Sequence, residues 1–179
     1  SSINTLAQNA NAVTVRSNTV VVSKNQSFGD KSETNPTGTV NAQQAKVASF
    51  VITAGQGEAA DVTQIVLADN DTTNCIGDHV QNLLIKNAAG TQLGATYANP
   101  SGTCTTANTY TFSVSPAVTI AAGGQYTVDV FGDLKASLTT ADVLVEVDAV
   151  TATGNNTGTT ASATSAQDVA LQQAYISTS

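Results

Sequence analysis

The stretch that decides the fold is residues 108–134, NTYTFSVSPAVTIAAGGQYTVDVFGDL. Bulky apolar and polar residues alternate along it in three short runs, which are interrupted at Ser115-Pro116 and at Gly123-Gly124. A period of two in β-branched and aromatic residues is typical of strands with one buried face, and Pro and Gly mark turns between them. We therefore predict half-buried antiparallel strands here, with turns at both interruptions.

The alternation predicts which side chains form the core. The same pattern continues in residues 142–153. The residues expected to be buried are Phe112, Val114, Ile120, Val128, Val130, Val145 and Val147. The residues expected outside are Thr111, Thr127 and Asp129.

Similar runs recur through most of the chain and predict an all-β protein. Further strands are expected at residues 47–52, 62–68, 80–88 and 91–97, with loops at 68–78 and 98–108 and a flexible segment at 153–166. The C-terminal run DVALQQAYIS fits either a strand or a helix capped by Ser165, and we favour a strand. Many short strands separated by turn signals predict an antiparallel β-sandwich, Ig-like or jelly-roll, over residues 46–179.

The first 45 residues have a different character. Residues 12–22, AVTVRSNTVVV, form one long strand or two short ones hinged at Ser17-Asn18, and residues 23–45 are polar and predict a linker. We predict an extended segment, residues 1–45, whose valine-rich part is donated to the sandwich of a neighbouring subunit; pairing with its own domain and donation of the C-terminal strand are the alternatives. The interface residues would be Val13, Val15, Val20, Val21 and Val22.

Composition narrows the class of protein. The chain has 179 residues, of which 41% are hydrophobic and only 11% charged, and its net charge is −7 with six basic residues. Nucleic-acid binding needs a basic patch, so we expect none. No run of eighteen apolar residues occurs, so we expect no membrane insertion. The Thr- and Asn-rich surface, and a chain that starts at Ser1, favour a secreted protein whose signal peptide has been removed.

Two cysteines and three sequons fit that location. Cys75 and Cys104 are separated by 28 residues, and a disulfide between them would contribute about 3.6 kcal/mol in the chain-entropy model. Free buried thiols and a metal site are the alternatives. Candidate glycan acceptors are Asn25, Asn70 and Asn155.

Residue chemistry offers little for catalysis. Asp69, Asp71 and Asp78 lie in one loop and are weak calcium candidates, since calcium takes oxygen ligands, but their spacing matches no EF-hand. The lone His79 has no partners for a nucleophilic triad and is expected to be exposed at a strand start. Glu58 and Asp61 are expected in a solvated turn. We therefore expect a non-enzyme without a cofactor. An isopeptide bond from one of three lysines remains a hypothesis: Lys46, Lys86 or Lys135.

A resemblance supports this interpretation. The runs KVASFVITAGQGEAADVTQIVLA, NLLIKNAAGTQLG and YTFSVSPAVTIAAGGQYTVDVFGDL resemble β-sandwich domains of secreted prokaryotic surface-layer and pilus-like filament proteins. The resemblance covers residues 46 to about 150 and implies an extracellular structural role. The first hypothesis is therefore a subunit of a filament or surface layer whose partner is itself. The alternative is a carbohydrate-binding or adhesive module of a larger secreted protein, with glycans or cell-surface proteins as partners.

Overall fold

The computed structural model describes residues 20–28, 38–69, 75–103, 108–136, 142–158, 160–164 and 172–177. Strands account for most of these residues. The elements are β1 (Val21–Lys24), β2 (Gly38–Thr39), β3 (Ala45–Thr53), β4 (Ala60–Asp69), α1 (Ile76–His79), β5 (Val80–Asn87), β6 (Gln92–Tyr97), β7 (Asn108–Ile120), β8 (Gln125–Leu134), β9 (Asp142–Gly154), β10 (Thr160–Thr164) and β11 (Gln172–Ser177).

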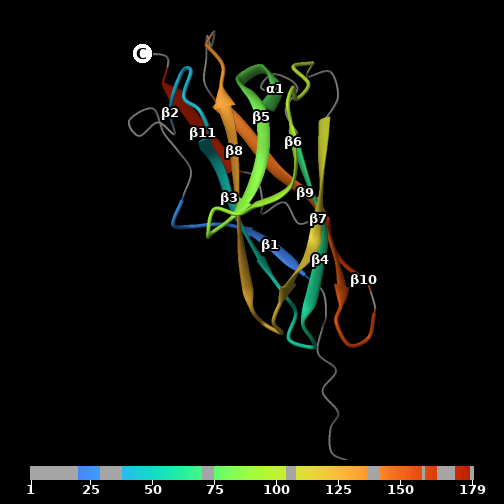
Figure 1. Ribbon diagram of the computed structural model, residues 1–179. Helices are drawn as coiled ribbons and strands as arrows, with labels where there is room; N and C mark the ends of the chain where they lie inside the picture. Colours follow the sequence, from blue (N-terminus) through green and yellow to red (C-terminus); the bar gives the residue numbers. More distant parts are fainter. Residues whose placement is uncertain are drawn as a thin grey trace, which may run out of the picture.

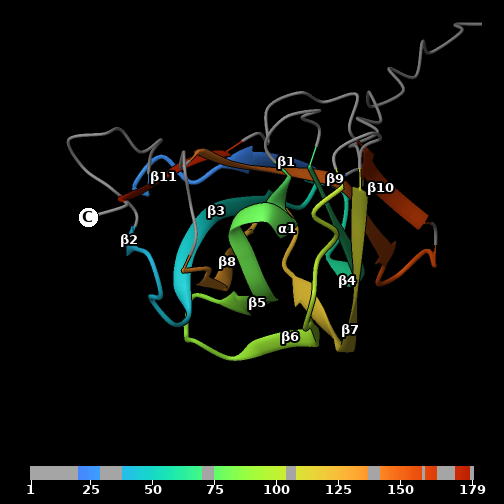
Figure 2. The ribbon, with the colours of Figure 1, turned by 90° about the horizontal axis from the view of Figure 1, so that it is seen from above.

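Two sheets pack face to face, so the predicted all-β sandwich is confirmed (Figure 1). One sheet has the order β1-β3-β8-β5-β6, and the other has the order β2-β11-β9-β4-β7, with β10 also paired to β9. Neighbouring strands are antiparallel except β2 and β11, which pair in parallel. Seen from above, the layers curve into a ring in which β6 lies beside β7 (Figure 2).

The chain passes repeatedly from one sheet to the other. The predicted Gly123-Gly124 turn is present, and it carries the chain from β7 to β8 in the opposite sheet. The turn after β3 does the same at the same end of the molecule. Backbone hydrogen bonds join the two turns, from the Ala54 N–H to the Gly124 carbonyl (3.0 Å) and from the Gly123 N–H to the Gly55 carbonyl (2.9 Å).

The predicted turn at Ser115-Pro116 is wrong, because β7 runs through it as one strand. The pairing of β7 with β4 shows how the strand accommodates the interruption. Val62 lies opposite Val118 and Gln64 lies opposite Ser113, so β7 carries extra residues between two paired segments. A bulge of this kind leaves the added residues outside the ladder and lets the strand continue.

The core lies between the sheets, and all seven residues predicted to be buried are buried. Phe50, Phe112, Ile65 and Leu67 are among its largest fully buried side chains. Burial of apolar surface at about 25 cal/mol per Å² is the main stabilising term for such a layer. Asp129 lies on the outer face, as predicted, but it is covered there and is only 8% exposed.

The described parts of the N-terminal segment, residues 1–45, pair with the sandwich of the same chain. β1 pairs with β3, β2 pairs with β11, and the Leu134 N–H donates to the Ala42 carbonyl at 2.8 Å. Residues 23–44 are therefore not simply a linker, because their described parts lie in or against the sandwich.

The C-terminal elements complete the second sheet. The strand interpretation is confirmed for residues 172–177, which form β11 against β9. The flexible segment predicted at 153–166 is wrong for its described part. The end of β9 and β10 form an antiparallel hairpin there, in which Thr160 lies opposite Thr153.

Because Val128 is 2% exposed between the sheets, Val128→Asp should prevent folding. An unpaired carboxylate in an apolar core costs several kcal/mol, which is comparable to the whole stability of a domain. Gln125→Asp, at the exposed start of the same strand, is the matched control and should melt like the wild type. Circular dichroism melting decides between these outcomes, and a cooperative wild-type transition in Val128→Asp would contradict the assigned core.

Candidate functional site

Asp69, the first calcium candidate, is fully buried and accepts several hydrogen bonds. Its carboxylate receives the backbone N–H of Asn108 at 2.8 Å, the backbone N–H of Ile76 at 3.2 Å and the Tyr110 hydroxyl at 3.3 Å. These donors join the end of β4 to the start of β7 and to α1. Asp69 therefore lies at the end of β4 and not in a loop as predicted, and it holds the neighbouring loops in place.

The remaining calcium candidates do not converge on Asp69 in the described structure. Asp78 is exposed on α1, and Asp71 lies outside the described residues. Within the described ranges, no group of three or more His, Cys, Asp or Glu side chains is placed to hold a metal ion.

Tyr110 complements the buried Asp69. Burial raises the pKa of the Tyr110 hydroxyl above its ordinary value, and the charge of Asp69 and its hydrogen bond raise it further. The hydroxyl therefore remains protonated and continues to donate to the carboxylate over the whole physiological range of pH.

His79 is the last residue of α1 and is 7% exposed, so the prediction that it is exposed is wrong. Its backbone carbonyl accepts a hydrogen bond from the Lys135 N–H at 3.0 Å. Because His79 ends a short helix and does not begin an exposed strand, its imidazole is buried.

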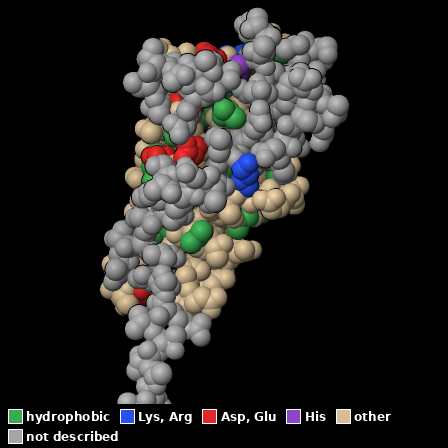
Figure 3. All heavy atoms as spheres, turned by 180° about the vertical axis from the view of Figure 1, so that it is seen from behind, with side chains coloured by type: hydrophobic (Ala, Val, Ile, Leu, Met, Phe, Trp, Pro, Cys, Tyr) green, Lys and Arg blue, Asp and Glu red, His purple; other side chains and the backbone are tan. Residues whose placement is uncertain are grey.

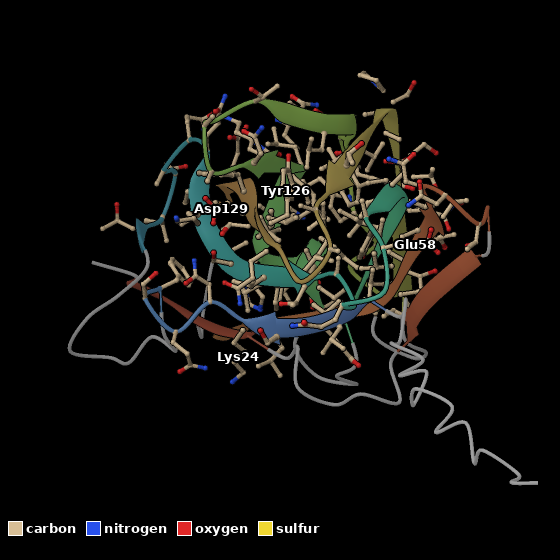
Figure 4. All side chains as sticks on the ribbon, turned by 90° about the horizontal axis from the view of Figure 1, so that it is seen from below. Lys24, Glu58, Tyr126 and Asp129 are labelled. Atoms are coloured by element: carbon tan, nitrogen blue, oxygen red, sulfur yellow. The ribbon has the colours of Figure 1, made fainter. Side chains whose placement is uncertain are left out.

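Glu58 is also buried, although it was predicted to be solvated. One carboxylate oxygen accepts the backbone N–H groups of Asn156 (2.8 Å) and Thr157 (3.0 Å), and the other accepts the Thr157 hydroxyl (2.5 Å). Figure 4 shows Glu58 on the side of the molecule where β9 and β10 lie. Glu58, which lies between β3 and β4, thus fixes the turn between β9 and β10, although the two segments are remote in sequence.

The sequons differ in accessibility. Asn155 is exposed in the turn that Glu58 holds. The side-chain amide of Asn25 is instead engaged at both ends: Nδ2 donates to Ser49 Oγ at 2.9 Å, and Oδ1 accepts from Ser27. A glycan on Nδ2 of Asn25 would compete with its bond to Ser49. Asn70 lies outside the described residues.

The three lysines considered for an isopeptide bond have polar or aromatic contacts. Lys46 Nζ lies 3.3 Å from Asp129 Oδ2 in an ion pair. Lys86 donates to Gln44 Oε1 at 2.7 Å and lies over the Phe131 ring. Lys135 donates to the Gly77 carbonyl. The ion pair with the mostly buried Asp129 carboxylate explains the position of the Lys46 side chain without an isopeptide bond.

The structure describes the valine-rich segment from residue 20 onward. This part of the segment pairs with β3 of the same chain. Val20 and Val22 are 0% and 3% exposed, whereas Val21 is 48% exposed. Val22 lies opposite Ile52 of β3, and β1 forms the outer strand of its sheet. Val13 and Val15 lie outside the described residues. In this single chain, the described part of the segment therefore occupies its own sandwich.

A polar cluster covers the outer face of β3 and β8 beside β1. Asp129 lies between the inward-facing Val128 and Val130, so it points to the outer face. Ser49 Oγ donates to Asp129 Oδ1 at 2.6 Å, and Asn25 reaches Ser49 from the end of β1. Figure 4 shows Asp129 beside β3 and Lys24 on the side where β1 lies. This cluster connects three adjacent strands, β1, β3 and β8.

Asp133 plays a similar part further along β8. Its carboxylate accepts the Gln44 N–H at 2.8 Å and the Asn82 side-chain amide at 2.7 Å. Both partners have positive φ values, 47° for Gln44 and 52° for Asn82. Non-glycine residues rarely adopt this backbone conformation, so the hydrogen bonds to Asp133 help to hold it.

The opposite side of the sandwich is closed by Tyr97. Its hydroxyl accepts the Thr111 N–H at 3.0 Å and donates to the Thr111 carbonyl at 2.9 Å. The Tyr97 ring packs edge-on against Tyr110 (5.6 Å between centroids) and Phe112 (5.3 Å), which flank Thr111. One phenol therefore satisfies both backbone groups of Thr111 at the outer edge of β7. We call this contact between β6 and β7 the tyrosine seam.

Gly94 brings β6 close enough for the tyrosine seam to form. It has φ of +73°, and a Cβ at this position would lie 2.9 Å from the Ser113 carbonyl oxygen. Only glycine combines that backbone conformation with that approach. The sequence showed Gly94 and Tyr97 within one predicted strand, but no local pattern indicated that both face β7.

The described side chains visible from behind include few acidic or basic groups (Figure 3). Among the described residues, Val21 is the one large hydrophobic side chain that is exposed. No helix in the described part of the chain is long and apolar enough to cross a membrane. Comparison of the chain with family models, curated proteins and solved structures yields no match.

The predicted disulfide can be tested by mass. Cys75 is fully buried and is not a free thiol, while Cys104 lies outside the described residues. We expect the intact protein, measured without reductant, to be lighter by two hydrogen atoms than the reduced form, because oxidation of a thiol pair releases them. Equal masses before and after reduction would exclude the Cys75–Cys104 bond.

Tyr97→Phe should weaken the tyrosine seam while keeping its ring. Loss of the hydroxyl leaves both backbone groups of Thr111 without their partner, so we expect a destabilisation of about 1 kcal/mol in urea unfolding. We also expect increased self-association in sedimentation velocity, because an uncovered edge can pair with another strand. Tyr126→Phe, on a half-buried ring of β8, is the control. Equal stability and sedimentation in the two variants would show that the seam hydroxyl contributes nothing.

Proposed function

We propose that the protein is a structural subunit of an extracellular filament or surface layer, and that subunits assemble by exchanging β1. The observation that carries the proposal is the position of Val20 and Val22. Both are buried in the core, yet Val22 lies in the short outer strand β1 and Val20 directly precedes it, and in the described structure this strand pairs with β3 alone. Contacts of this kind are the same whether the strand comes from the same chain or from a neighbour.

Chain length permits the exchange. The segment from Phe28 to Gly38 joins β1 and its following turn to the rest of the sandwich. Ten residue steps span at most about 35 Å. A domain of some 150 residues has a radius of gyration of about 15 Å, and hence a diameter of about 38 Å. The segment therefore reaches a neighbour in direct contact, and it equally allows β1 to occupy its own sheet.

The sheet edges favour β1 as the assembly point. At the opposite side, the tyrosine seam occupies the outer backbone groups of Thr111, which discourages strand addition to β7 at that point. β1 instead carries the exposed Val21. Strand addition supplies main-chain hydrogen bonds and buries alternate side chains in pockets of the acceptor.

The adhesive alternative has less support in the described residues. Sugar-binding surfaces commonly use exposed aromatic rings, but Tyr97, Tyr110 and Phe112 pack against one another. The exposed large hydrophobic residue of the described surface is a valine. The extracellular location is itself part of the proposal, and it rests on the low-charge, Thr-rich composition and the predicted disulfide.

A chain that accepts a strand but cannot donate one tests the proposal. We expect the wild-type protein to form filaments or sheets in negative-stain electron microscopy, and the full-length variant Val20→Asp/Val22→Asp to form none, because two carboxylates cannot enter the apolar acceptor site. Mixed with wild-type protein, the variant should shorten the polymers, since each added copy lacks a usable donor strand.

Two controls complete the experiment. Ser23→Asp changes an exposed position of the same strand and should assemble normally. Val20→Ala/Val22→Ala, which is milder, covers the case in which the double Asp variant does not fold, and it should assemble weakly. Polymers of normal length from the double Asp variant, or a wild-type protein that stays monomeric at all concentrations, would contradict the proposal.

A further inference from the structure

A continuous chain of polar contacts runs from the end of β1 across two strands. Asn25 Nδ2 donates to Ser49 Oγ (2.9 Å), and Ser49 Oγ donates to Asp129 Oδ1 (2.6 Å). The second oxygen of Asp129 pairs with Lys46 Nζ at 3.3 Å. Ser49 and Asp129 are 0% and 8% exposed, so the chain ends in a buried carboxylate whose two oxygens both have partners.

The residues after Asn25 hold its side chain in position. Asn25 Oδ1 accepts the Ser27 N–H (3.1 Å) and the Ser27 hydroxyl (2.7 Å), and the Asn25 carbonyl accepts the Phe28 N–H (3.0 Å). This tight turn places the Phe28 ring 5.3 Å from Lys46 Nζ. We call residues 25–28 the hook. Because Oδ1 is held inside the hook, Nδ2 is directed towards Ser49.

The valines of β1 do not select one register on their own. Val22 lies opposite Ile52 and Lys24 opposite Phe50. A shift of two residues in one direction would place Lys24 opposite Ile52 and move Val22 beyond Thr53, the last residue of β3, so that its contact with Ile52 would be lost. A shift of two in the other direction would place Val20 opposite Ile52 and Val22 opposite Phe50. That register keeps both valines on the buried face, since side chains alternate with a period of two.

The hook distinguishes these two registers. In the observed register Asn25 meets Ser49, through its side chain and through a backbone bond from the Asn25 N–H to the Ser49 carbonyl at 2.9 Å. In the shifted register Ser23 would lie opposite Ser49. The Ser23 side chain is shorter than that of Asn25 and is not part of the hook. In the shifted register the hook would lie two residues further along β3, and the Phe28 ring would no longer lie over Lys46. Asn25 therefore supplies the specificity that the valines lack.

We propose that the hook, seated on Ser49 and Asp129, sets the register and the identity of the strand that β3 accepts, in its own chain and in a second copy. The binding partner is thus a β-strand that ends in an Asn-x-Ser-Phe turn. A second subunit carries such a strand in its own residues 20–28. The part of this proposal that concerns a second copy rests on the proposed function; the part that concerns register does not.

The register is tested in the full-length monomer. Asn25→Ala should lower the hydrogen-exchange protection of the β1 amides about five- to tenfold, the effect of losing one or two net hydrogen bonds. The contact between Val22 and Ile52, observed as a nuclear Overhauser effect, should weaken, and contacts of Val20 with Ile52 should appear. Gln26→Ala, at an exposed position of the hook, should change neither quantity. Unchanged protection and an unshifted register in Asn25→Ala would overturn the proposal.

A double-mutant cycle separates the hook from a general weakening of β1. If Asn25 acts through Ser49, adding Asn25→Ala to Ser49→Ala should cost much less protection than adding it to the wild type, because the shared bond is already absent. Asn25→Ser, a smaller change, should reproduce the shifted register if Asn25→Ala leaves β1 undocked. Additive effects of the Asn25 and Ser49 substitutions would show that their contact does not set the register.

The partner is tested with synthetic peptides of residues 19–28 added to assembling full-length protein. The wild-type peptide should block polymer growth, and a peptide with Asn25→Ala should need about a five- to tenfold higher concentration. Equal potency would overturn the specificity assigned to the hook. If the wild-type protein does not polymerise, the proposed function fails, while the measurements on the monomer still decide whether the hook sets the register.

Discussion

The structure depends on the pairing of backbone and carboxylate groups where strands end and where sheets have an edge. An apolar layer stabilises the two sheets, but it cannot satisfy N–H and C=O groups at turns, and burying them unpaired costs free energy. Here buried acids accept many of these donors. Asp69 holds the loops at the ends of β4 and β7, Glu58 holds the turn after β9, and Asp133 holds the segments before β3 and within β5.

This use of carboxylates suits a chain with 13 acidic and six basic residues. Asp69, Glu58 and Asp133 accept hydrogen bonds from backbone N–H groups, amides and hydroxyls, and Asp129 has an ion pair with Lys46 in addition to its bond from Ser49. Hydrogen bonds from neutral donors to a charged acceptor are stronger than those between neutral groups. Loops can therefore be held firmly without many lysines or arginines, and the surface remains sparsely charged.

The two edges of the sandwich, at β7 and at β1, are closed in different ways. At the tyrosine seam, a phenol occupies the edge of β7, and Gly94 allows β6 to approach it. At the other side, the short strand β1 closes the sheet with the buried Val22 and the buried Val20 that precedes it, and the hook fixes it to Ser49. In the proposed assembly, the edge closed by β1 differs from the sealed edge, because the site on β3 would take an equivalent strand from another chain. This asymmetry links the fold to the proposed assembly.

Local patterns were sufficient for the strands and for much of the core. Alternation in residues 108–134 and 142–153 correctly placed Phe112, Val128 and Val145 inside, because a period of two directly reports which face of a strand is apolar. The same logic placed Asp129 outside the apolar layer, and it does point to the outer face. Its burial could not be predicted, because the cover comes from Ser49 and Lys46, about 80 residues away in the chain.

The sequence by itself determined an all-β sandwich, its low charge and the position of most turns, since these depend on composition and on neighbours within a few residues. Tertiary structure decided that Pro116 lies within a strand, that Glu58, Asp69 and His79 are buried, and that Tyr97 closes the edge of β7. It also decided that β1 lies on β3 in this chain. The physical reason is the same in each case: burial and edge pairing are made between segments remote in sequence, and no local period encodes which two will meet.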